Sequence, residues 1–162
     1  MNVLVTGCFG FIGYNFLIYL NKKFPKDFNL IGVDSLITKT SRENQIEFKD
    51  TNNFTFYELD INDINKISEN SIDLIINFAA ESHVDNSITD PNKFIKSNVM
   101  GTNELLKFAY KNEINDFIHI STDEVYGSNK ESFSLETDIL DPSSPYSASK
   151  ASAEMICNAY IK

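Results

Sequence analysis

Cysteine, basic residues and long apolar runs are scarce in this sequence, and each scarcity argues against a class of protein. The two cysteines, Cys8 and Cys157, are too few and too far apart for the disulfide framework of a small secreted domain, so we interpret both as core-filling residues. No apolar run approaches the roughly 20 residues that a membrane-spanning helix requires. Only 14 Lys and Arg stand against 23 Asp and Glu, and the net charge of −9 argues against nucleic acid or an anionic membrane as a partner.

The first residues also lack the basic segment of a secretory signal peptide, because the chain enters an apolar run at once. We therefore expect a reduced, cytoplasmic protein. The 162 residues amount to one domain, and a hydrophobic fraction of 42% with a charged fraction of 23% is ordinary for a globular protein. The acidity does not argue against a nucleotide ligand, because backbone N–H groups can bind phosphate inside an acidic protein.

Strand-like and helix-like segments alternate along the whole chain, and this alternation predicts an α/β fold with a parallel sheet and helices on both faces. The expected strands are 3–5, 29–34, 54–58, 72–78 and 116–121. The expected helices are 11–24, 42–48, a short one that begins after Asp60 and ends near 70, 92–112 and 146–162.

A glycine-rich turn joins the first expected strand to the first helix. Gly7, Gly10 and Gly13 follow the spacing Gly-x-x-Gly-x-x-Gly, which differs from the Gly-x-Gly-x-x-Gly of the common dinucleotide-binding turn. Glycines allow the backbone to approach a pyrophosphate, and the helix that follows presents unpaired N–H groups to it. We interpret the turn as a dinucleotide site in a Rossmann-like, doubly wound parallel sheet; a plain tight turn is the alternative.

Asp34 ends the second expected strand, 21 residues after Gly13. A dinucleotide-binding fold places near this point the carboxylate that accepts hydrogen bonds from the adenosine ribose. The same carboxylate would repel a 2′-phosphate, so it favours NAD over NADP. The alternative is that Asp34 caps a turn at the end of the strand.

Small and polar residues follow the fourth expected strand. The pair Ala79-Ala80 lies where a parallel sheet binds its ligands, and its small side chains leave room for a flat group. His83 could titrate near neutrality, although we favour a hydrogen-bonded loop histidine. Asn98 lies in the apolar stripe of helix 92–112, so it is either a buried residue whose partner could be a cofactor or a solvated one. His119, inside the fifth strand, reads as a core or interface histidine.

Tyr146 and Lys150 are four residues apart on the last expected helix and therefore share a face. A neighbouring ammonium group lowers the pKa of a tyrosine, which can then take a proton from a sugar hydroxyl as a hydride leaves the carbon. The motif is weak by itself, because surface helices contain it by chance. It gains weight from its place after a fifth strand in a chain that opens with a nucleotide-binding turn.

The stretch Thr122-Asp123-Glu124 follows the fifth expected strand, at the same edge of the sheet. Two adjacent carboxyls suit an elimination, in which one removes a proton and the other donates one to a leaving hydroxyl, provided that their environments differ. The alternative is that Asp123 and Glu124 are solvated acids in a turn.

Taken together, these residues resemble the extended short-chain dehydrogenase/reductases, and more closely the nucleotide-sugar 4,6-dehydratases, typified by dTDP-glucose 4,6-dehydratase. The glycine turn and the Tyr146/Lys150 pair mark only the superfamily. Thr122-Asp123-Glu124 is more specific, because epimerases and decarboxylases of the superfamily usually have other residues there. The matching stretches are 6–13, 78–85, 98–102, 121–127 and 144–152.

The resemblance implies NAD as the cofactor and a nucleotide-activated hexose, dTDP-glucose or UDP-glucose, as the substrate. Tyr146, assisted by Lys150, would deprotonate the 4-hydroxyl while a hydride passes from C4 to NAD. Glu124 would then remove the C5 proton, and Asp123 would protonate the departing 6-hydroxyl. Return of the hydride to C6 would give a 4-keto-6-deoxy sugar nucleotide.

The resemblance also assigns binding residues. Thr122 would hold the sugar near its 4-oxygen, Ser82 would contact the substrate, and no metal site is implied. The residues that match NAD contacts of the family are Gly7, Gly10, Phe11, Ile12, Gly13, Asp34, Asp60, Ile61, Phe78, Ala79, Ala80, Ser97, Tyr146 and Lys150.

Further expectations follow from the resemblance. The family pairs its subunits through helices that match 92–112 and 146–162, which implies a homodimer. Family members are longer than this chain, so we expect residues 1–162 to be the N-terminal, NAD-binding portion, with the C-terminal substrate domain absent. The sheet would then be truncated after the fifth strand and the helix that follows it, leaving that strand as an unpaired, aggregation-prone edge. The alternatives are a related NAD-dependent nucleotide-sugar epimerase and a truncated dinucleotide-binding module without turnover.

Overall fold

The fold is a parallel sheet of five strands in a computed structural model that describes residues 1–162 apart from 49, 70, 129–132 and 162. The strand order is β3-β2-β1-β4-β5, so the chain starts in the middle of the sheet and winds outward in both directions. This confirms the predicted Rossmann-like, doubly wound fold. The strands are β1 (Asn2–Thr6), β2 (Asn29–Asp34), β3 (Phe54–Glu58), β4 (Leu74–Asn77) and β5 (Asp116–His119).

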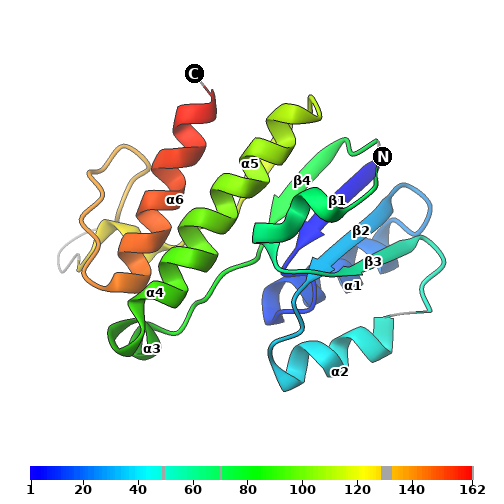
Figure 1. Ribbon diagram of the computed structural model, residues 1–162, viewed down its shortest axis with the longest axis horizontal. Helices are drawn as coiled ribbons and strands as arrows, with labels where there is room; N and C mark the ends of the chain where they lie inside the picture. Colours follow the sequence, from blue (N-terminus) through cyan, green and yellow to red (C-terminus); the bar gives the residue numbers. More distant parts are fainter. Residues whose placement is uncertain (49, 70, 129–132, 162) are drawn as a thin grey trace.

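Helices cover both faces of the sheet, and Figure 1 shows α5 and α6 lying side by side. The α-helices are α1 (Phe11–Lys23), α2 (Lys39–Phe48), α3 (Val84–Thr89), α4 (Pro91–Phe94), α5 (Gly101–Lys111) and α6 (Pro145–Ile161). Two 3₁₀ helices, η1 (Ile61–Lys66) and η3 (Asp123–Tyr126), and one π-helix, η2 (Ile95–Met100), complete the chain.

Alternate side chains of the central strands build two separate cores. Val3 and Val5 of β1 point into one core, which they share with α1 and with Phe48 of α2. Leu4, between them, points into the other core, which is built with η1 and α5. Because successive side chains of a strand point to opposite faces, a strand buried on both faces reads as a continuous apolar run. Cys8 lies in the first core, as the sequence predicted; Cys157 is partly buried, and both are free thiols.

The helix that was expected over 92–112 is interrupted. It begins at Pro91, widens into the π-helix η2 at Ile95 and returns to α-helical geometry at Gly101. The sequence did not predict this wide turn, because π-turns are rare and occur mostly as single turns inside α-helices. Asp90 occupies the N-cap as predicted for a capping residue, but its side chain makes no cap hydrogen bond.

Several other boundaries differ from the predictions. The short helix after Asp60 ends at Lys66 rather than near 70, and residue 70 itself lies outside the described residues. The fourth and fifth strands are shorter than predicted, whereas α2 begins three residues earlier, at Lys39. The helix α3 was not predicted from the sequence. Residue 162, at the end of the last predicted helix, lies outside the described part, as do residues 129–132.

The last strand of the sheet is β5, which in the described residues pairs only with β4. Ile118 on β5 is 47% exposed. None of the helices in the described part of the chain is long and apolar enough to cross a membrane. Because all five strands are parallel, their carboxyl ends lie along one edge of the sheet, where the glycine turn, Asp34 and the residues after β4 and β5 come together.

Candidate active site

The glycine turn packs directly against the chain that leaves β4. Gly7 has a left-handed backbone (φ +61°), and a Cβ added to it would lie 2.6 Å from the backbone nitrogen of Ala79. A Cβ on Gly13 would lie 2.3 Å from the carbonyl oxygen of Gly7, so the first turn of α1 closes on the turn itself. We expected these glycines to let the backbone approach a ligand. They also let two segments of the backbone approach each other, the turn and the chain after β4.

The N-terminus of α1 is open to an anion. Gly10 is the N-cap and has no side chain to bond the first N–H groups, and no acidic residue stands in the first turn. Phe11 and Ile12, the first two residues of this 13-residue helix, are exposed. Free N–H groups and the positive end of the helix dipole are what a pyrophosphate requires, so the turn fits a dinucleotide.

Asp34 binds the glycine turn from the neighbouring strand. One carboxylate oxygen accepts from the N–H of Phe9 at 2.9 Å, and the other accepts from the N–H of Leu36 at 2.8 Å. The bond to Leu36, two residues ahead, is the turn-capping role that the sequence offered as the alternative. Asp34 therefore shapes the turn, and its place at the carboxyl end of β2 is also the one expected of a ribose ligand.

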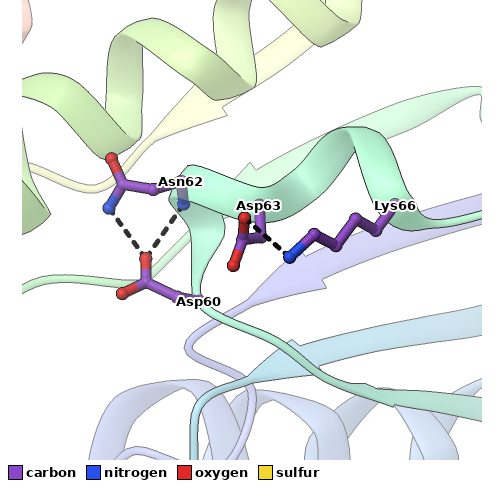
Figure 2. Close-up of polar contacts among 4 residues, drawn as sticks. All are labelled: Asp60, Asn62, Asp63 and Lys66. Atoms are coloured by element: carbon purple, nitrogen blue, oxygen red, sulfur yellow. Dashed lines mark hydrogen bonds and ion pairs between the residues drawn. The ribbon is translucent and has the colours of Figure 1, made fainter.

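Asp60 caps η1, as the sequence predicted. One of its oxygens accepts from the backbone N–H of Asn62 at 2.9 Å and from the amide of the same residue at 2.7 Å, while Asp63 pairs with Lys66 at 2.9 Å (Figure 2). Ile61 is buried in the core. Its side chain is therefore engaged in packing, which leaves its backbone to meet a ligand.

The segment after β4 runs from the core to the surface. Phe78 and Ala79 are partly buried, whereas Ala80 and Ser82 are exposed. His83 is also exposed, at the N-cap of α3, and makes no side-chain cap hydrogen bond there, which differs from the hydrogen-bonded loop histidine that was favoured.

Asn98 is buried, with 1% of its surface exposed, and it anchors the segment after β4. Its side-chain oxygen accepts from the N–H of Glu81 at 2.8 Å, and its amide donates to the carbonyl of Glu81 and to Ser149 Oγ, both at 2.9 Å. The burial confirms the first of the two interpretations and rules out a solvated Asn, and the partners seen on both sides of the amide are protein groups. Ser97, the adjacent predicted NAD contact, is partly buried on η2.

Tyr146 and Lys150 are both buried in the first turns of α6, where they are 8% and 3% exposed. The Lys150 amine donates to the carbonyl of Ile120 at 2.6 Å and lies 3.3 Å from His119 Nε2. The sequence placed the pair on one face of a helix, and the structure places that face against the chain at the end of β5. The approach of His119 to the lysine was not predicted, although the sequence placed His119 inside the fifth strand.

Burial sets the proton affinities of the pair. It lowers the pKa of Lys150 to about 8, against the opposing effects of Glu154 and Cys157. Burial also raises the pKa of Tyr146, a hydrogen bond with Thr122 lowers it, and the negative charges of Glu124 and Asp123 raise it. The expectation of a tyrosine pKa lowered by the lysine is wrong for this structure, because desolvation dominates and the lysine amine is bonded to the Ile120 carbonyl.

The helix η3 packs against α6, which brings Thr122, Asp123 and Glu124 near Tyr146. Thr122 is the N-cap of η3: its hydroxyl accepts from the N–H of Glu124 at 3.3 Å and lies 3.4 Å from an oxygen of Asp123. Asp123 and Glu124 are exposed, which agrees with the alternative of solvated turn acids. One tyrosine, one lysine, a threonine hydroxyl and two carboxylates therefore gather at the ligand-binding edge of the sheet.

A family model described as GDP-mannose 4,6 dehydratase matches residues 4–162. The chain belongs to this family. The match confirms the resemblance to the nucleotide-sugar 4,6-dehydratases that the stretches around Gly7, Thr122 and Tyr146 indicated.

Individual relatives agree with the family. The low-salt glycan biosynthesis protein Agl12 of Haloferax volcanii is 43% identical over 162 residues, which cover 99% of this chain and 52% of that protein. The dTDP-glucose 4,6-dehydratase DesIV of Streptomyces venezuelae, solved with NAD bound, is 38% identical with a TM-score of 0.91, over 99% of this chain and 51% of that one. A UDP-glucuronic acid 4-epimerase of Bacillus cereus in complex with NAD is 30% identical with a TM-score of 0.84, over 99% and 52%. The chain thus spans about half the length of the relatives it matches.

Replacing Gly7 tests the packing of the glycine turn against the chain after β4. We expect Gly7→Ala to lower the free energy of unfolding by about 2 kcal/mol or more, because a left-handed backbone costs an L-residue about 1–2 kcal/mol and the new Cβ meets backbone atoms that cannot move aside. Gly10→Ala is the matched control, since Gly10 has φ −65° and its Cβ would come no closer than 3.3 Å to the Gly7 carbonyl. Urea unfolding followed by circular dichroism measures both, and equal losses would contradict the packing argument.

Proposed function

We propose that this chain carries the NAD-binding and catalytic residues of an enzyme that converts a nucleotide-activated hexose, dTDP-glucose or UDP-glucose, into its 4-keto-6-deoxy form. The observation that carries the proposal is the gathering of Tyr146, Lys150 and Thr122-Asp123-Glu124 at the edge of the sheet that also holds the glycine turn. The NAD-bound structure of a dTDP-glucose 4,6-dehydratase with a TM-score of 0.91 supports it.

The residues of the adenosine side fit NAD. The open N-terminus of α1 would bind the pyrophosphate, with Gly7, Gly10 and Gly13 keeping the space free of side chains. Asp34 would accept from the ribose hydroxyls with the lone pairs that its two backbone bonds leave free. When bound, NAD would accept a hydride from C4 of the sugar and return it to C6.

Tyr146 and Lys150 would handle the first proton. The phenolate of Tyr146 takes the proton of the sugar 4-hydroxyl, so that the C4–O bond becomes a carbonyl as the hydride departs. Thr122, which lowers the pKa of Tyr146, would hold the 4-oxygen beside the tyrosine. The buried setting of the pair keeps water away from this step.

The two carboxyls would perform the elimination. The 4-keto group acidifies the C5 proton, which Glu124 removes, and the electron pair of the C5–H bond forms the C5–C6 double bond. Asp123 donates a proton to the 6-hydroxyl, which leaves as water. Once the hydride is back on C6, C5 would take a proton from Glu124 to complete the 4-keto-6-deoxy sugar. The roles of the two residues follow the family resemblance, and their position beside Tyr146 supports them.

A second function has support from the epimerase structure, which shares 30% of the sequence and a TM-score of 0.84. A nucleotide-sugar epimerase would use Tyr146, Lys150 and NAD in the same way but would have no task for two adjacent carboxyls. The presence of Asp123 and Glu124 beside Thr122 therefore favours the dehydratase.

The reaction products distinguish these functions. With NAD and dTDP-glucose or UDP-glucose in deuterated water, we expect a 4-keto-6-deoxy sugar nucleotide with deuterium at C5, read by mass spectrometry and NMR. Inversion at a ring carbon without loss of water would instead identify the epimerase. If the folded protein binds NAD but forms no product, residues 1–162 do not turn over by themselves. The dinucleotide-binding module without turnover would then be the remaining alternative.

Glu124→Gln tests the assignment of the base. In a form of the protein that turns over, we expect the substitution to lower product formation by roughly 100-fold or more, the range that general base catalysis supplies. NAD affinity should stay unchanged, because Glu124 lies on η3 rather than in the glycine turn. Isothermal titration with NAD is the control, and loss of NAD binding would show that the role given to Glu124 is wrong.

A homodimer through the helices 92–112 and 146–162 forms part of the proposal. Its support is that both helices leave large apolar side chains exposed, among them Ile95, Met100, Tyr110 and Met155. We expect Met155→Glu to shift the protein from dimer to monomer in sedimentation velocity, because it places a charge in an apolar interface. Ile46→Glu on α2, where the isoleucine is 63% exposed, is the matched control and should leave the dimer intact. A wild-type monomer at all concentrations would contradict the dimer.

A further inference from the structure

A chain of buried hydrogen bonds runs beneath the candidate site and ends at Lys150. Asn77, the last residue of β4, is 1% exposed and lies at the centre of it. Its side-chain oxygen accepts from Thr6 Oγ1 at 2.6 Å and from the backbone N–H of Ala79 at 3.2 Å. Its amide nitrogen lies 3.3 Å from Thr102 Oγ1 and 3.1 Å from His119 Nδ1. Four elements of the fold therefore meet at one amide.

The backbone N–H of Ala79 fixes which way this amide points. A backbone N–H can only donate, so the atom of Asn77 that faces it must be the oxygen, and the NH₂ group must face His119. His119 Nδ1 therefore accepts a hydrogen bond and carries no proton. A neutral imidazole has one proton, which leaves it on Nε2, and a doubly protonated ring would set two donors against each other at Nδ1.

The same logic extends to Lys150. Its amine lies 3.3 Å from His119 Nε2 and donates to the Ile120 carbonyl at 2.6 Å. The Nε2–H of the histidine points at the lysine nitrogen, so an ammonium group would place two donors face to face. A neutral amine accepts the Nε2–H with its lone pair and still donates to Ile120.

We propose that His119 is a positioning residue for Lys150: held in the Nε2–H form by Asn77, it donates to the lysine nitrogen and favours the neutral amine. This role rests on the proposed function, in which Lys150 assists Tyr146. The direction agrees with the lowered pKa values of both groups, about 3 for His119 and about 8 for Lys150, which burial causes in each case.

The consequence for the reaction concerns the number of protons on the Tyr146–Lys150 pair. Phenol plus amine holds the same number of protons as phenolate plus ammonium, so the pair is ready for catalysis once it has lost a single proton. A lysine that gives up its proton easily brings the pair to this state at lower pH. As the tyrosine takes the proton of the sugar hydroxyl, its own proton would pass to the neutral lysine amine, so no further proton need leave to solvent.

Other charged groups act on the pair and are part of the same balance. Glu154, one turn after Lys150 on α6, raises the lysine pKa and is itself bonded by Ser121, and the Cys157 thiol acts in the same direction. On the other side, Asp123 and Glu124 on η3 raise the pKa of Tyr146. In this proposal His119, on β5, favours the neutral amine of Lys150, whereas Glu154 favours the ammonium form.

The tautomer of His119 tests the proposal directly and needs no turnover. The chain has two histidines, so His83→Gln leaves His119 as the sole imidazole signal. In the nitrogen-15 NMR spectrum of this variant we expect a protonated Nε2 and an unprotonated Nδ1, without titration between pH 8 and pH 5. A proton on Nδ1, or a ring that charges in this range, would overturn the proposal.

A matched pair of substitutions separates positioning from packing. In His119→Asn, the side-chain oxygen takes the place of Nδ1 and still accepts from Asn77, but no group donates to the lysine nitrogen. The nitrogen of Gln in His119→Gln matches Nε2 and restores a donor. We expect His119→Asn to raise the Lys150 titration, followed by NMR of carbon-13-labelled lysine, by on the order of one pH unit, and His119→Gln to stay near the wild type. Equal values in all three proteins would overturn the proposal.

In a form of the protein that turns over, the same pair predicts the pH profile. The acidic limb of kcat should move to higher pH in His119→Asn by the shift seen in the lysine titration, with KM for the sugar nucleotide unchanged, and His119→Gln should bring it back. A profile that does not follow the lysine titration would refute the link to catalysis. Absence of turnover would count against the proposed function alone, because the tautomer and the lysine titration are measured without substrate.

Discussion

The contact between Gly7 and the backbone of Ala79 is the constraint on which the site depends. It brings the turn after β1 against the chain leaving β4, closer than any side chain allows. Because the two strands are neighbours in a parallel sheet, this contact also sets where the ends of β1 and β4 lie relative to each other. The carboxylate of Asp34 then ties the next residues of the turn, through the N–H of Phe9, to the end of β2. Three strand ends are thereby fixed around one short turn.

Polar side chains buried under this edge hold the neighbouring segments in position. Asn77 and Asn98 are each 1% exposed and have protein partners on both ends of their amides. A buried amide left unpaired costs about 1–3 kcal/mol, so each of them accepts few alternative arrangements of its neighbours. Asn98 holds the segment after β4 to α6, and Asn77 holds that segment to β5 through His119. The position of Lys150 follows from both, since it lies on α6 and reaches β5.

The sequence predicted a doubly wound parallel sheet and nearly all its elements, because apolar runs and glycine spacing are local signals. It also predicted the turn at Gly7, the cap at Asp60 and the place of Tyr146 and Lys150 on one helix. What it missed depends on contacts distant in the chain. The partners of Asn98 and the approach of His119 to Lys150 join residues 17 to 51 positions apart. The π-helix η2 was missed as well, since the apolar spacing predicted one continuous helix there. The pKa of Tyr146 was predicted in the wrong direction because spacing on a helix says nothing about desolvation.

The two halves of the proposed chemistry lie in different environments. Tyr146 and Lys150 are buried, and the groups around them are fixed by packing before any ligand arrives. Asp123 and Glu124 are exposed to water in the described part of the chain. Electrostatic effects strengthen when water is excluded, so the oxidation at C4 draws on the fold, whereas the elimination at C5 and C6 needs the bound sugar nucleotide, or protein that covers it, to exclude water. Binding energy from the nucleotide, far from the reacting carbons, is what would supply that closure.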